Sequence, residues 1–269
     1  MSRFGGYEDL PFLAELYDRL PAYAARKDVD FYVSCALAAE GPTLELACGT
    51  GRVLLPIAEA GCRIAGLDLS EYMLAKCREK LEHASADVQE RVRIVHGDMT
   101  QFDLGESFAL VTTPFRSFQH LVSVEDQLAC LLCANHHLSV GGTLILDLFH
   151  PNLRYLCDPR ADEEKEDCAG VALPGGRTLR QTHRLVAHHR AQQCIDVEMI
   201  FYVGHSDGCE ERLVHAFPLR YFFRYEVEHL LQRCGFDVIE LLGNHDRSPF
   251  SDDSPEMIVV AKKTAHWHA

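Results

Sequence analysis

The sequence predicts an α/β fold: a doubly wound, mostly parallel seven-stranded sheet, with a small antiparallel sheet inserted after the fifth strand. Apolar strand-like runs alternate with helical patterns between residues 43 and 148, which is typical of a parallel sheet. A glycine loop connects the first strand to the helix that follows it. From residue 178 the pattern changes to strands that alternate polar and apolar side chains.

The expected core elements follow one another with short connections. In chain order they are strand 43–47, helix 51–60, strand 63–67, helix 71–82, strand 92–96, strand 108–112, helix 124–138 and strand 143–148. Ser70 suits the N-cap of the second helix, because its hydroxyl can accept from a backbone N–H of the first turn. After a helix at 224–234, two further strands are expected at 236–242 and 257–262.

Two segments lie outside this alternating core, which spans residues 43–150. Residues 1–42 contain two helical patterns, at 9–20 and 29–40. Residues 173–223 form the expected insert, preceded by a charged connector. Its strands are predicted at 178–189, 193–203 and 210–220. Such strands can roof a pocket or pair two subunits, so the insert is expected to do one or both.

The loop after the first strand is the most informative stretch of the chain. Gly49 and Gly51 can adopt backbone angles closed to other residues and let a ligand approach the main chain. Asp68, seventeen residues after Gly51, ends the second strand and can accept hydrogen bonds from ribose hydroxyls. The third glycine of a dinucleotide-binding loop is absent, because Leu54 stands there. The loop therefore predicts a nucleoside-bearing cofactor, and a dinucleotide is disfavoured.

Three motifs in order resemble those of one enzyme family. Glu45–Arg52 resembles the first motif of class I S-adenosylmethionine-dependent methyltransferases, and Asp68–Ser70 with Met73 resembles the second. Gly97–Met99 resembles the third. The resemblance covers about residues 40–150 and extends to the C-terminal strands, which would close the sheet as an antiparallel hairpin. It implies a Rossmann-like fold, S-adenosylmethionine as the cofactor, and a helical lid formed by the N-terminal segment.

The resemblance also implies which residues hold the cofactor. Asp68 would bind the ribose, and Asp98 the adenine amino group, although Asp98 could also be a turn or cap residue. Met73 and Met99 would flank the adenine or simply fill the core. The expected cofactor-binding residues are Glu45, Ala47, Gly49, Thr50, Gly51, Asp68, Leu69, Met73, Asp98, Met99 and Thr113.

The acceptor is expected beyond the carboxyl ends of the fourth and fifth strands, where open α/β sheets bind ligands. His120 is the candidate general base, because imidazole titrates near neutral pH, but it could equally be a structural loop histidine. Arg116 could bind an anionic acceptor group or form an internal ion pair. The expected acceptor-binding residues are Tyr17, Phe115, Arg116, His120, Phe149, His150, Arg220 and Tyr221.

Composition and local sequence narrow the class of acceptor. A net charge of −14 disfavours the binding of nucleic acids, because it repels their phosphate backbones. Thr112 and Thr113 stand where enzymes that methylate DNA bases or glutamine amides carry a side-chain amide, so DNA is not expected as a partner. No apolar stretch is long enough to cross a membrane, and no signal peptide is evident, so a cytoplasmic location is expected. No metal site is expected from the scattered histidines and cysteines.

The leading hypothesis is a methyltransferase that acts on N, O or S of a small molecule. Alternatives are a protein or RNA methyltransferase, a nicotinamide-dependent oxidoreductase, and a non-catalytic cofactor-binding protein. A homodimer is also expected as one use of the inserted sheet.

Overall fold

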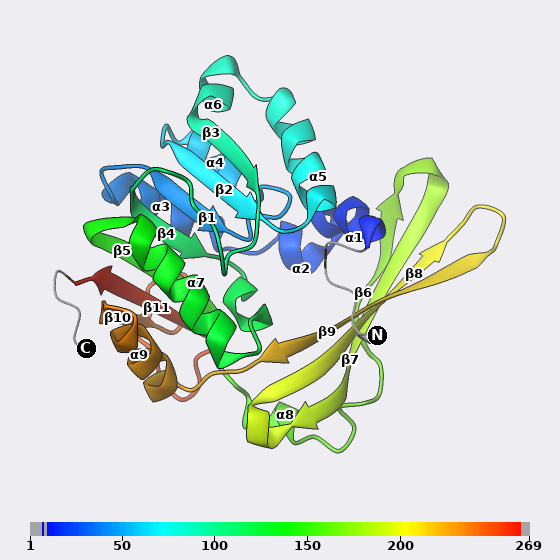
Figure 1. The fold of residues 1–269 in the computed structure, drawn as a ribbon. Helices are drawn as coiled ribbons and strands as arrows, with labels where there is room; N and C mark the ends of the chain where they lie inside the picture. The colour runs from blue at the N-terminus through cyan, green and yellow to red at the C-terminus, as the bar shows by residue number, and fades with distance from the viewer. Residues whose placement is uncertain (1–6, 8–9, 265–269) are drawn as a thin grey trace.

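A seven-stranded sheet forms the centre of the protein in the computed structural model, which describes Tyr7 and residues 10–264 (Figure 1). The strand order is β10-β11-β5-β4-β1-β2-β3. The strands are β1 (Thr43–Leu46), β2 (Ile64–Asp68), β3 (Val92–His96), β4 (Phe108–Thr113), β5 (Leu138–Phe149), β10 (Phe236–Leu242) and β11 (Glu256–Lys263). The first five pair in parallel, and β11 runs antiparallel to both β5 and β10. The predicted doubly wound sheet with a closing hairpin is therefore confirmed.

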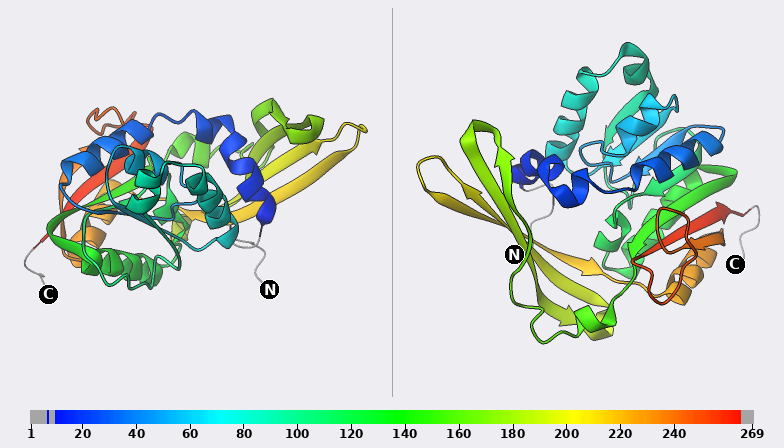
Figure 2. Two further views of the ribbon diagram at one scale, coloured as in Figure 1. Left: turned by 90° about the horizontal axis from the view of Figure 1, so that it is seen from above. Right: turned by 180° about the vertical axis from the view of Figure 1, so that it is seen from behind.

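Helices cover both faces of this sheet (Figures 1 and 2). One apolar core joins the strands to α7 (Val124–His137) and α9 (Arg224–Arg233). The other core joins them to α3, α4, α5 and α6. The bounds of these four helices are Val29–Ala38, Leu54–Glu59, Glu71–Glu82 and Ala86–Arg91. Adjacent strand residues alternate between the two cores, as Leu110 and Val111 do, so the central strands are buried on both sides.

Local signals place most helix boundaries, with two differences. Ser70 accepts from the backbone N–H of Met73, so it is the N-cap of α5 as predicted. The helix expected from residue 51 begins at Leu54, because Gly51 has a positive φ of 80° that no right-handed helix contains. The helix expected over residues 9–20 is divided into α1 (Pro11–Leu16) and the short 3₁₀ helix η1 (Tyr17–Arg19), and the unpredicted α2 (Pro21–Ala24) follows. Proline at the start of α2 lacks the N–H that would continue the preceding helix.

The inserted sheet has four strands, one more than predicted. Its order is β6-β7-β8-β9, with bounds Lys165–Leu173, Arg177–His189, Cys194–Gly204 and Glu210–Arg220. The additional strand, β6, includes part of the stretch predicted to be a charged connector. Its side chains are mostly exposed and two register shifts interrupt its pairing with β7, so it lacks the apolar alternation that reveals a strand in sequence. Figure 2 shows this sheet projecting from the core beside the N-terminal helices.

The N-terminal helices pack between the inserted sheet and the core. Leu13 and Leu16 of α1 share an apolar cluster with Leu179 and Phe201 of the insert and with Met73 of α5. This cluster joins three segments that are far apart in the chain. The described part of the N-terminal segment before β1, which we call the lid for its position, and the insert therefore form one wall against the carboxyl ends of the strands.

No helix in the described part of the chain combines the length and the apolar character needed to span a bilayer.

Gly66 in β2 leaves no room for a side chain. A Cβ placed there would lie 2.2 Å from Leu54 Cδ1 and 2.8 Å from Cys48 Sγ, both in the core. We expect Gly66→Ala to lower the free energy of unfolding by roughly 1–3 kcal/mol through overpacking, measured by urea denaturation. Ala172→Val, which adds apolar volume at an exposed position of β6, should change it by less than about 0.5 kcal/mol. Equal effects of the two substitutions would contradict this account of Gly66.

Candidate active site

One elongated cavity of about 500 Å³ runs along the carboxyl ends of the parallel strands. Its position is the one expected for a ligand in an open α/β sheet. Twenty residues line it: Tyr7, Tyr17, Ala47, Gly49, Leu67, Asp68, Leu69, Ser70, Met73, Gly97, Asp98, Met99, Thr100, Phe115, Ser117, His120, Leu121, Asp126, Phe217 and Pro218. The set contains side chains from the cofactor motifs, the lid, the loop after β4 and the inserted sheet.

The glycine loop after β1 has the backbone that its sequence predicts. Gly49 and Gly51 have positive φ angles of 55° and 80°, in the region where side chains are disfavoured. A Cβ on Gly51 would lie 2.7 Å from Cys77 Sγ of α5, so this position is also sterically closed. The N–H of Gly49 donates to Asp68 Oδ2 at 2.7 Å. This bond fixes the loop against the end of β2.

Two carboxylates at this end suit different parts of S-adenosylmethionine. Asp68 accepts from Gly49 and, through Oδ1, from the N–H of Ser70 at 2.8 Å. Each carboxylate oxygen can accept more than one hydrogen bond, so ribose hydroxyls can still be bound. Glu45 is buried, and its Oε2 lacks a hydrogen-bond partner among the described residues. Burial raises the pKa of this carboxyl, and it does not line the cavity directly; the amino group of the methionine portion of the cofactor is a partner that could satisfy Oε2. The residues present therefore fit the cofactor.

The lining residues that follow β2 and β3 include apolar side chains, as an adenine site requires. Met73 and Met99 line the cavity there together with Leu69, whose side chain is exposed despite its apolar character. Asp98 forms a turn in which its Oδ1 accepts from the N–H and the hydroxyl of Thr100, both at 2.8 Å. Both roles considered for Asp98 are therefore compatible: it shapes the turn and it lines the cavity.

The opposite half of the cavity has aromatic walls. His120 belongs to the 3₁₀ helix η2 (Ser117–His120), which follows β4. Its ring lies 5.7 Å from that of Tyr7 and 5.1 Å from that of Phe217, between centroids. Tyr17 and Phe115 complete this end, which we call the aromatic end. It combines the lid, the loop after β4 and strand β9.

The polar groups of the aromatic end are uncharged at neutral pH. Desolvation lowers the pKa of His120 to about 4, so its imidazole carries no proton charge there. Desolvation raises the pKa of Tyr17 to about 12, although Arg52 opposes this shift, and burial also raises the pKa of Tyr7. His120 can thus accept a hydrogen bond, but it is a weak base.

Four predicted cofactor residues do not line the cavity. Glu45, a buried residue of β1, and Gly51 are not among the lining residues. Thr50 is buried and donates from Oγ1 to Asp18 of the lid at 2.7 Å. Thr113 is fully buried in β4. The chain places the other seven predicted cofactor residues on the cavity wall.

Five predicted acceptor residues are likewise absent from the cavity wall. Arg116 and Arg220 form ion pairs with Glu256 and Glu226, at 3.3 and 2.7 Å. The other three contact distant parts of the chain. Phe149 and Tyr221 belong to an apolar cluster, and His150 contacts Ser254 and Phe250. For Arg116, the internal ion pair was the alternative to an acceptor contact. Tyr17, Phe115 and His120 do line the cavity.

The sequence did not single out two of the aromatic walls. Tyr7 precedes the first helical pattern, and its carbonyl accepts from the Ser70 hydroxyl at 2.7 Å. Phe217 lies on β9, in a strand whose residues alternate between two partly covered faces. Its alternation with Leu213 and His215 could have suggested a shared face, but no local signal tells which face meets the cavity.

Comparison with known proteins agrees with this geometry. Residues 43–142 match a family model described as a methyltransferase domain. A dTDP-3-amino-3,6-dideoxy-alpha-D-glucopyranose N,N-dimethyltransferase of Streptomyces fradiae is 34% identical over 72% of this chain and 69% of its own.

Two solved structures share the fold. The CcbJ methyltransferase from Streptomyces caelestis superposes with a TM-score of 0.76 at 24% identity, over 96% of this chain and 98% of its own. CalS10, an amino pentose methyltransferase from Micromonospora echinaspora solved with S-adenosylmethionine bound, gives a TM-score of 0.70 at 23% identity, over 93% and 97%.

The motif order, the sheet topology and the position of the cavity all lead to the same assignment, which the Streptomyces fradiae relative supports over most of its length. The chain belongs to the class I S-adenosylmethionine-dependent methyltransferases.

Proposed function

We propose that the protein transfers the methyl group of S-adenosylmethionine to an amine nitrogen of a small molecule. The observation that carries this proposal is the chemistry of the aromatic end. Its walls are aromatic rings and a neutral imidazole. Among the described residues that line the cavity, the carboxylates are those of Asp68, Asp98 and Asp126, and the lid, η2 and β9 contribute none. The cavity volume of about 500 Å³ lies in the range of small-molecule sites.

Nitrogen suits this environment better than oxygen. An amine attacks with its own lone pair: the N–C bond forms, the S–C bond breaks, and the positive charge passes from sulfur to nitrogen. Aromatic faces stabilise a cation before and after this step. A hydroxyl acceptor must instead lose a proton, and an imidazole whose pKa is about 4 is a poor base for that purpose.

The names of related proteins support the same acceptor class. The Streptomyces fradiae relative is named for dimethylation of an amino sugar, and CalS10 for an amino pentose. Those names describe the related proteins, and the amine is a proposal for this chain. The absence of DNA as a partner, the cytoplasmic location and the homodimer stay predictions.

We propose that the neutral imidazole of His120 accepts a hydrogen bond from the amine N–H and thereby orients the amine that is methylated. The cavity-lining residues Tyr7, Tyr17, Phe115 and Phe217 would surround the acceptor, and Asp68 and Asp98 would hold the nucleoside. Proximity and alignment supply most of the catalysis in such a site.

Substitution of Asp68 tests the cofactor site. We expect Asp68→Ala to weaken S-adenosylmethionine binding about 10- to 100-fold, because ribose hydrogen bonds to a carboxylate are lost. Isothermal calorimetry measures the change. Asp252→Asn, a substitution of an exposed loop carboxylate, should bind as the unsubstituted protein does. Full affinity in Asp68→Ala would disprove the ribose assignment.

A screen with methyl-labelled S-adenosylmethionine tests the acceptor class. Small primary and secondary amines should gain label, and matched alcohols in which a hydroxyl replaces the amine should not. The rate should rise with pH up to the pKa of the acceptor amine, because only the unprotonated form has a free lone pair. Labelling of the alcohols in preference to the amines would overturn the proposal.

The pH dependence of His120 variants tests the role of the imidazole. Because the pKa of His120 is about 4, its protonation should not appear in rates measured between pH 6 and 9. We expect His120→Ala to lower kcat by roughly 10-fold, as expected for a lost orienting contact, with an unchanged profile shape. A rate limb near neutral pH that disappears in His120→Ala would show instead that His120 acts as a base.

A further inference from the structure

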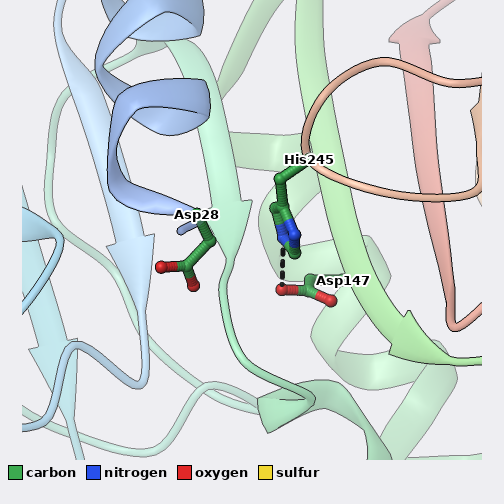
Figure 3. Close-up of side chains that lie close together, drawn as sticks. All are labelled: Asp28, Asp147 and His245. Atoms are coloured by element: carbon green, nitrogen blue, oxygen red, sulfur yellow. Dashed lines mark hydrogen bonds and ion pairs between the residues drawn. The ribbon is translucent and has the colours of Figure 1, made fainter. Parts of the chain in front are cut away.

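A buried cluster of charged side chains lies behind the aromatic end. Three carboxylates, Asp28, Asp147 and Glu256, alternate with the guanidinium groups of Arg26 and Arg52. Asp28 and Asp147 are fully buried. Figure 3 shows these two carboxylates with the imidazole of the neighbouring His245, contributed by three separate segments of the chain. Burial of charges is costly unless they are paired, and here each of the three carboxylates is paired with a guanidinium group.

A metal ion is one explanation, and the arginines make it unnecessary. Asp28, Asp147 and His245 each offer a ligand atom within 4.8 Å of the others. Arg26 already supplies the positive charge between the carboxylates. Its Nε donates to Asp28 at 3.0 Å, and its Nη2 donates to Asp147 at 3.2 Å and to Glu256 at 3.0 Å. The guanidinium thus bridges three acids that belong to the lid, β5 and β11.

The same contacts connect the cofactor loop to the wall of the cavity. Arg52 directly follows Gly51, and its guanidinium binds both oxygens of Asp28, at 2.5 and 2.7 Å. Arg26 joins Asp28 to Asp147. Asp147 Oδ2 then accepts from the backbone N–H of Phe115 at 3.1 Å. Every contact in this series is a charge-assisted hydrogen bond, the stronger and more directional kind.

The loop that this series reaches is strained. Phe115 and Arg116 have positive φ angles of 53° and 67°, a conformation that costs energy for residues other than glycine. Asp147 restrains both residues: its carboxylate binds the N–H of Phe115, and its carbonyl binds the N–H of Arg116 at 3.1 Å. The Arg26 guanidinium lies 4.8 Å from the centre of the Phe115 ring. The ring is thereby held at the cavity wall.

We propose that Arg26 is a positioning residue for methyl transfer. It holds Asp147 and the strained Phe115–Arg116 turn so that the Phe115 ring closes the aromatic end, and through Asp28 and Arg52 it ties this wall to the cofactor loop. The role needs the shape of a guanidinium as well as its charge, because one Lys Nζ cannot reproduce the forked donors that meet three carboxylates. The inference rests on methyl transfer at this site, and it does not depend on the acceptor being an amine.

The test compares Arg26→Lys and Arg26→Gln by hydrogen–deuterium exchange, with S-adenosylhomocysteine binding measured by calorimetry. In both variants, we expect peptides that cover residues 113–118 to exchange at least about 10-fold faster, because Asp147 keeps Tyr32 and His245 but loses the guanidinium that also contacts the Phe115 ring. S-Adenosylhomocysteine affinity should stay within about 3-fold, because the cofactor loop keeps its own bonds from Arg52 to Asp28 and from Gly49 to Asp68 when Arg26 is replaced. With any acceptor found in the labelling screen, kcat should fall about 100-fold in both variants while KM changes little.

Two outcomes would overturn the proposal. If Arg26→Lys exchanges and turns over as the unsubstituted protein does, charge balance alone is the role of Arg26. If both variants lose S-adenosylhomocysteine affinity to the same extent as kcat, Arg26 supports the fold in general. Arg224→Gln, which breaks an exposed ion pair with Glu228 on α9, is the matched control and should change none of these quantities. If Arg26→Gln does not fold, the charge-conserving Arg26→Lys decides the question.

The exchange measurement keeps this proposal separate from the proposed function. It requires no acceptor, so it decides the role of Arg26 even if every amine in the screen stays unlabelled. Conversely, amine labelling by the unsubstituted protein with normal exchange in Arg26→Lys would support the acceptor class and reject the positioning role.

Discussion

Parallel pairing of β1 with β2 and with β4 is the constraint on which the site depends. It brings the ends of three strands to one edge of the sheet, and with them the glycine loop, Asp68 and the loop of Phe115. The hydrogen bond from Gly49 to Asp68 then joins two of these ends directly. Because both faces of the sheet are covered by helices, this edge is where the backbone can meet a ligand. Short sequence motifs at the ends of these strands therefore form the cofactor half of the cavity.

The aromatic end has a different origin. It exists only because the lid and the inserted sheet pack against each other and against α5, through the apolar cluster that contains Met73, Leu179 and Phe201. That packing excludes water, which is why the pKa of His120 lies below its ordinary value and the pKa of Tyr17 above it. The half proposed to bind the nucleoside thus contains the carboxylates Asp68 and Asp98. In the aromatic end, the charge of the proposed reaction would be carried by the sulfonium and the amine.

The difference in origin explains what the sequence could predict. Gly49, Asp68 and Asp98 were found because their positions relative to strands and to one another are local properties of the chain. Arg220 and His150 were expected in the site and lie beside it, because their partners, Glu226 and Ser254, are set by tertiary packing. Phe217 was missed for the same reason: alternation indicates that a strand has two faces, and only the packed structure says which face meets the cavity. The strand β6 was missed because its exposed side chains and interrupted register leave no apolar alternation.

The wall formed by β9 and the cofactor loop formed by residues 47–51 are separated by most of the chain, although both line one cavity. If the acceptor occupies the aromatic end as proposed, substitutions in the inserted sheet can alter which molecule is methylated without changing the residues proposed to bind the methyl donor. On the proposed assignment, the enzyme can acquire a new methyl acceptor through changes in one segment of the chain. The residues of the donor site can stay unchanged meanwhile. On this account, donor binding is the inherited property of the scaffold, and acceptor choice is the property that diversifies.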